Sequence, residues 1–173
     1  MASGDRIMLE LGQMSASARQ GTVFSISSIG TGVVVVVYDA RNLVGGVACV
    51  SMPESKLSMQ APIEDVTKDK PAKFADLAIP LLLEEFRALG GDKNISTVRL
   101  VGGAQLFNFG GGGGNLLNIG VRNAMAIRTA LTKEGFVVEK ADTGGNKPRS
   151  IRFELSTGNV YVRAIGSVED YTV

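Results

Sequence analysis

The stretch SIGTGVVVVVYD, Ser28 to Asp39, decides the fold of this chain. Small residues run into five consecutive valines, and a segment that is apolar on both faces is typical of a central strand covered on both sides. The next apolar segment, Asn42 to Met52, contains GGVACVSMP and follows after a short turn. We therefore expect the two segments to pair as a β-hairpin.

Strand and helix patterns alternate over the rest of the sequence. Apolar periodicity predicts helices over 72–89 and 120–136, the first ended by two glycines, whereas 59–71 is polar and predicts an exposed loop. Further strands are expected at 7–12, 22–30 and 98–107, with a hairpin turn at 156–159. We expect one α+β domain over residues 1–173, built from layered mixed β-sheets with two main helices.

Composition excludes several classes of function. The 173 residues carry a net charge of +1, so no overall field attracts nucleic acid or an anionic membrane. The longest apolar run, 32–38, is far shorter than the ~20 residues of a membrane span, and no secretory signal is recognisable at the start of the sequence. We expect a cytoplasmic protein without membrane insertion or nucleic-acid binding.

The residue counts also limit the chemistry, because the sequence has one cysteine and no histidine. A disulfide within the chain is impossible, and zinc sites built from several Cys and His ligands cannot form. Imidazole is also unavailable as a general base. We expect neither a metal nor another cofactor.

A glycine tract, Gly110 to Gly114, follows Phe107 and Phe109. A phosphate-binding loop needs a lysine and a Ser or Thr directly after the glycines, and Asn115 and Leu116 stand there instead. We interpret the tract as a flexible surface loop. The two phenylalanines are either anchors for a partner or core residues.

Several collinear motifs carry a family resemblance over about residues 7–165. They are SIGTGVVVVVYD, GGVACVSMP, KPAKFADLAIPLLLEEF, VRLVGGAQLF, NIGVRNAMAI, ADTGGNKPRSIRF and STGNVYVR. This order resembles CheD, the chemoreceptor glutamine deamidases of bacterial and archaeal chemotaxis. The resemblance implies a layered α+β fold, also seen in deamidating toxins, and a catalytic Cys–His pair assisted by a threonine.

The chain departs from the family at the implied catalytic positions. The family motif resembling LGSCV places the nucleophile at Gly32, and the motif resembling GGxxHxxLP places the histidine at Cys49, 17 residues later. The threonine position falls near Ile26. Cys49 has apolar neighbours and is either a buried core residue or a relocated nucleophile. Backbone N–H groups near Thr31 remain available as an oxyanion pocket.

The resemblance also implies the rim of a cleft. Its residues are Gly102, Gly103, Asn118, Asn123 and Thr143, together with Thr31, Gly32 and Cys49 at its centre. Asn118 is alternatively the N-cap of the second helix. DTGGNKPRS, Asp142 to Ser150, is alternatively a glycine-dependent turn with a solvated basic edge.

Our leading hypothesis is a catalytically degenerate CheD-like protein that acts by binding. The resemblance implies chemoreceptor cytoplasmic helices or a CheC-like phosphatase as partners. One alternative is a residual or altered glutamine deamidase that uses Cys49. A second is a small-ligand site in the pocket that Gly32 leaves open.

Overall fold

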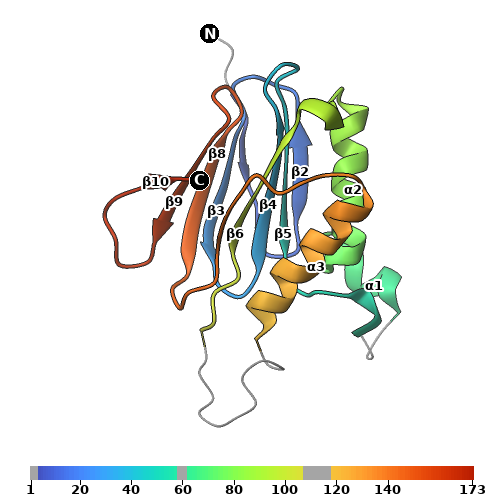
Figure 1. Ribbon diagram of the computed structural model, residues 1–173, viewed down its shortest axis with the longest axis vertical. Coiled ribbons are helices and arrows are strands. Elements are labelled where there is room, and N and C mark those ends of the chain that lie inside the picture. Colours follow the sequence, from blue (N-terminus) through green and yellow to red (C-terminus); the bar gives the residue numbers. More distant parts are fainter. Residues whose placement is uncertain (1–3, 58–61, 107–117) are drawn as a thin grey trace.

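The computed structural model describes residues 4–57, 62–106 and 118–173 (Figure 1). The helices are α1 Ile63–Thr67, α2 Ala75–Ala88 and α3 Ile119–Lys133, with short 3₁₀ turns at Ser55–Leu57 and Lys93–Ile95. The strands are β1 Arg6–Met8, β2 Met14–Ser17, β3 Val23–Ile29, β4 Val33–Asp39, β5 Val44–Val50, β6 Thr97–Gly102, β7 Lys140–Thr143, β8 Arg149–Glu154, β9 Asn159–Ala164 and β10 Tyr171–Thr172.

The strands form two five-stranded mixed sheets. The first sheet has the order β1-β3-β8-β9-β10 and the second β2-β5-β4-β6-β7. Only β1 with β3 and β6 with β7 run parallel; the other neighbours are antiparallel. Helices α2 and α3 lie on one side of the second sheet, and the first sheet lies on its other side (Figure 1). The order of layers is therefore helices, second sheet, first sheet.

Strand β4 is the centre of this arrangement, because both of its faces are covered. Val33, Val35 and Val37 belong to the core beneath the helices, and Val34 and Val36 belong to the core between the sheets. β4 pairs with β5 along its whole length, with Val33 opposite Val50. An uninterrupted β-branched run suits this position, since neither face meets water.

The two main helices start and end where local chemistry favours it. The side chain of Asn118 accepts a hydrogen bond from the N–H of Val121 at 3.1 Å and so caps α3. After α2, Gly90 has a φ of +97° and the N–H of Gly91 bonds to the carbonyl of Phe86. This left-handed glycine ends the helix as its sequence indicates.

The α+β fold class, the β4–β5 hairpin and the two main helices are confirmed. Three boundaries were wrong. The strand expected over 7–12 is limited to β1, Arg6–Met8. Residues 63–67 of the expected loop form the short helix α1, and the strand expected over 98–107 ends at Gly102, whose φ of +118° is incompatible with continued pairing. Within the described ranges, none of the helices combines the length and apolarity needed to cross a bilayer.

Candidate functional site

One end of the second sheet brings together the segments that the resemblance singled out. The start of β4 lies beside the end of β6, where Val33 pairs with Gly102, and Gly102 in turn pairs with Thr143 at the end of β7. The first half of α3 joins them through Asn123. Segments up to 110 residues apart in sequence, as Val33 and Thr143 are, thus meet at one end of the second sheet. The end of β6 and the start of α3 mark this end at the bottom of Figure 1.

Asn123 holds the frame of this site together. Its buried amide donates to the carbonyl of Thr31 at 3.0 Å and to that of Ser51 at 3.1 Å. These carbonyls belong to the segment before β4 and the segment after β5. One side chain on α3 therefore fixes the open end of the hairpin against the helix.

The Gly102–Gly103 turn closes the frame from the other side. The N–H of Gly103 donates to the carbonyl of Gly32 at 2.7 Å, and the N–H of Ala104 donates to that of Gly30 at 2.9 Å. Both glycines of the turn have left-handed backbones, with φ of +118° and +68°. A side chain is disfavoured at either position, and the turn can approach Gly32 closely because it has none.

The space beside Gly32 is filled. A Cβ atom added at this residue would lie 2.5 Å from Cδ1 of Leu11, 2.9 Å from Cδ1 of Ile29 and 2.8 Å from the carbonyl oxygen of Val50. Its φ lies outside the left-handed region, so packing and not backbone conformation restricts this position. A cysteine here would have to displace two side chains and a backbone carbonyl.

Cys49 is a core residue in this structure. Cys49 pairs with Val34, and the side chains of Cys49 and Val34 both point toward the first sheet. Its exposed fraction is 0%, and this burial raises the pKa of the thiol to about 12. The thiol is therefore protonated near neutral pH and shielded from any substrate.

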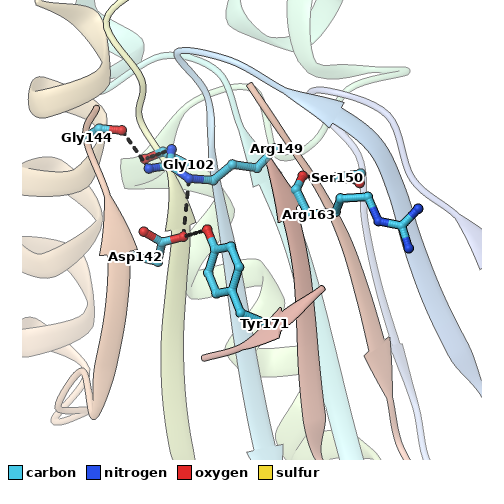
Figure 2. A network of polar contacts seen from close by, with 7 residues as sticks. All are labelled: Gly102, Asp142, Gly144, Arg149, Ser150, Arg163 and Tyr171. Atoms are coloured by element: carbon cyan, nitrogen blue, oxygen red, sulfur yellow. Dashed lines mark hydrogen bonds and ion pairs between the residues drawn. The ribbon is translucent and has the colours of Figure 1, made fainter. Parts of the chain in front are cut away.

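An ionic network centred on the buried Arg149 braces the Gly102 turn (Figure 2). Arg149 donates to the carbonyls of Gly102 at 3.3 Å and Gly144 at 2.7 Å, and its Nε lies 3.2 Å from a carboxylate oxygen of Asp142. The hydroxyl of Tyr171 donates to the same oxygen. The interpretation of Asp142 to Ser150 as having a solvated basic edge was wrong for Arg149, which is buried because these acceptors satisfy its charge.

Besides Cys49, which is a core residue, the expected site residues fall into three groups. Thr31, Gly32, Gly102, Gly103 and Asn123 are joined by direct hydrogen bonds or strand pairing. Asn118 caps α3 and Thr143 pairs with Gly102, so both lie at the border. Phe107, Phe109 and the tract 110–114 lie outside the described residues.

Sequence reasoning missed Leu11 and Tyr171, which contact the site from segments without a motif, and Ile29, which lies within the first motif but was not singled out. No local pattern distinguishes the leucine that covers Gly32 from any other exposed leucine. Arg149 was visible within DTGGNKPRS, but its burial depends on acceptors supplied by β6 and β7. No cluster of three or more potential metal ligands occurs among the residues described.

The frame defines a class of protein: an α+β domain with two mixed sheets and a glycine turn that closes over one end of the second sheet. A family model described as "CheD chemotactic sensory transduction" matches residues 52–164. The chain is 39% identical over 139 residues to the probable chemoreceptor glutamine deamidase CheD of Desulforamulus reducens, covering 80% of this chain and 79% of that protein. It is 36% identical over 138 residues to the protein of the same name from Clostridium botulinum (strain Hall), covering 80% of each.

The chain therefore belongs to the CheD family. The segment matched by the family model begins at Met52, just after Cys49, and so excludes both positions of the implied catalytic pair. The assignment of Gly32 and Cys49 to those positions depends on the collinear motifs and their spacing.

Proposed function

We propose that this chain is a catalytically degenerate CheD protein that acts by binding a chemoreceptor cytoplasmic helix or a CheC-type phosphatase. The observation that carries the proposal is the state of the implied catalytic pair: a packed glycine at position 32 and a buried, protonated cysteine at position 49. Since such receptor helices lie in the cytoplasm, we place the protein there.

The chemistry of deamidation explains why these two positions matter. A thiolate must attack the amide carbonyl of glutamine, a base must generate that thiolate, and an acid must protonate the departing ammonia. Gly32 supplies no nucleophile, and the sequence contains no histidine to serve as base. We therefore assign the frame around Gly32 a role in recognition.

Neither alternative has a comparable observation in its favour. A deamidase based on Cys49 needs an accessible thiolate, whereas this thiol faces the core between the sheets. A small-ligand pocket at Gly32 needs space that Leu11 and Ile29 occupy. Both stay predictions that the assays below test.

The surface over the frame suits binding through shape. Leu11, which covers Gly32, is 42% exposed, and Leu106, which contacts Gly30, is 39% exposed. A shallow hollow of about 700 Å³ is lined by Leu106 together with Gln105, Gly145 and Asn146. Exposed apolar side chains beside a hollow are typical anchors of protein interfaces.

The absence of catalysis is tested directly. Purified protein is incubated with receptor cytoplasmic fragments, and conversion of glutamine to glutamate is followed by mass spectrometry. We expect no conversion above background. Conversion that Cys49→Ala abolishes would overturn the degenerate assignment and establish Cys49 as a nucleophile.

Binding is tested with the same fragments and with CheC-type phosphatases by calorimetric titration. Leu106→Ser is expected to weaken binding, because it removes an anchor at the frame. Val137→Ser is the matched control, since Val137 is 82% exposed and follows α3 far from the α3 start at the site. No binding to either class of protein, or equal effects of the two variants, would contradict the proposal.

A further inference from the structure

A second surface, the groove between α2 and α3, has the features of a helix-binding site. It has a volume of about 510 Å³ and is walled by α2, by α3 and by the segment around Pro53. Pro53 follows Ser51, whose carbonyl Asn123 holds, so the groove starts beside the site frame. From there it follows α3 toward its C-terminal end.

The groove face of α3 has a regular pattern. Its lining residues are Arg122, Met125, Ala126, Thr129, Ala130 and Lys133, which recur at intervals of three and four. That spacing places them on one stripe of the helix, separate from the core stripe that contains Ile127 and Leu131. The helix therefore presents a second stripe with equal numbers of apolar and polar residues. Ala126 and Ala130 also pack against the core, and Met125 is the exposed apolar side chain of this stripe, at 62%.

The charges at the ends of this stripe decide what the groove binds. Arg122 and Lys133 are 11 residues apart, about three turns or roughly 16 Å along the helix. No carboxylate of the described residues lies within ion-pair distance of either cation, and the remaining residues include no Asp or Glu. Each end of the groove thus offers a positive charge to a partner.

The three carboxylates that line the groove each have a closer partner than these two cations, although Asp76 keeps its negative charge because its partners are neutral donors. The pairs are Glu54 with Lys56 at 2.9 Å, Glu134 with Arg87 at 3.2 Å, and Asp76 with the backbone N–H of Ser55 at 2.9 Å and its hydroxyl at 2.6 Å. The complementary partner is a helix with small apolar residues between two carboxylates.

We propose that this groove binds an amphipathic helix carrying carboxylates three turns apart, and that it prefers the glutamate form of such a helix to the glutamine form. The inference rests on the proposed function for the identity of the partner. Deamidation, the activity named for the relatives, converts a neutral glutamine into a glutamate. A family member without catalysis and with two available cations would then recognise the product of the reaction.

The test uses two synthetic helices of about 20 residues, long enough to be helical in an alanine-rich background. One carries glutamate at two positions 11 residues apart, and the other carries glutamine there. Fluorescence anisotropy with the full chain is expected to show roughly tenfold tighter binding of the glutamate helix, a preference that added salt reduces.

Variants assign the preference to the groove. Arg122→Gln and Lys133→Gln are each expected to weaken binding of the glutamate helix about threefold to fivefold and to leave the glutamine helix unaffected. Arg128→Gln is the matched control, because Arg128 lies on the same helix but lines a separate hollow with Phe136 and Val138. Thermal unfolding verifies that all three variants fold.

Equal binding of the two helices, or an equal effect of Arg128→Gln, would overturn this inference. Binding experiments with receptor fragments distinguish failure of the groove inference from failure of the proposed function. Binding that Leu106→Ser weakens and Arg122→Gln leaves unchanged would retain the proposed function and overturn the groove. Binding of the glutamate helix without binding of any receptor fragment or phosphatase would retain the groove and contradict the proposed partners.

Discussion

At its turn, the β4–β5 hairpin buries a charged side chain, whereas at its open end it buries a glycine and a neutral thiol. Asp39 at the turn is fully buried and accepts hydrogen bonds from the N–H groups of Arg41, Asn42 and Asp92 and from the side chain of Asn42. Gly32 and Cys49 at the open end make no side-chain polar contact within the described residues. The turn is thus held by a charged side chain of the hairpin itself, whereas the open end is held by the amide of Asn123 from α3.

The comparison predicts that the turn contributes far more to stability than the open end. Asp39→Ala should lower the free energy of unfolding by about 3 to 5 kcal/mol, because it removes four hydrogen bonds to a buried carboxylate that organises the turn. Urea denaturation followed by circular dichroism measures the change. A loss below about 1 kcal/mol would show that water replaces the carboxylate, and that the turn is less tightly organised than its geometry indicates.

Asp39 also makes the stability of the fold depend on pH, and the direction of its pKa shift gives the sign of this dependence. Burial alone raises the pKa of the Asp39 carboxyl, but the hydrogen bonds from Asn42, Asp92 and Arg41 outweigh it and hold the pKa below its usual range. The carboxylate therefore contributes its full stabilisation at pH values above the pKa of an unfolded aspartate, about 3.9. This stabilisation is lost as the pH falls through the lower pKa of Asp39 in the folded state. Asp39→Asn should flatten this acid limb of the stability curve.

At the open end, the thiol of Cys49 should be inert in the folded protein. With a pKa of about 12, its thiolate fraction at pH 8 is about 10⁻⁴, before burial further limits access. Alkylation followed by mass spectrometry should be at least roughly a thousandfold slower in the native state than in denaturant. Comparable rates in the two states would show that the core between the sheets opens readily, and would favour the Cys49 enzyme alternative.

Restoring the implied catalytic pair should fail for a steric reason. Gly32→Cys alone is expected to cost about 1 to 3 kcal/mol, since its Cβ would meet Leu11, Ile29 and a backbone carbonyl. Adding Cys49→His should cost more, because it places a larger, polar ring at a fully buried position. Combining Leu11→Ala with Gly32→Cys should recover part of this loss of stability, because the Leu11 side chain makes the nearest contact to the new Cβ. A fully stable, active Gly32→Cys, Cys49→His protein would show that the frame accommodates the nucleophile without rearrangement.

The sequence predicted what depends on local pattern and missed what depends on distant partners. The valines of β4 indicate a strand covered on both faces, and Asn118 indicates a helix start, because each signal lies within a few residues. The role of Asp39 depends on the N–H of Asp92, 53 residues away, and that of Arg149 on acceptors from two other strands. Likewise, Leu11 occupies the space beside Gly32 only because separate segments of the chain pack together there.

The smallest expected effect concerns the network that braces the Gly102 turn. Tyr171→Phe removes one hydrogen bond from the carboxylate of Asp142, which still pairs with Arg149. Because Tyr171 is partly exposed and water can replace its hydroxyl, the loss should be about 1 kcal/mol or less. Arg149→Met should cost more, since Asp142 would lose its cation and the carbonyls of Gly102 and Gly144 their donors. Denaturation of both variants measures the difference; a Tyr171→Phe loss as large as that of Arg149→Met would mean that β10, and not the arginine, holds the turn in place.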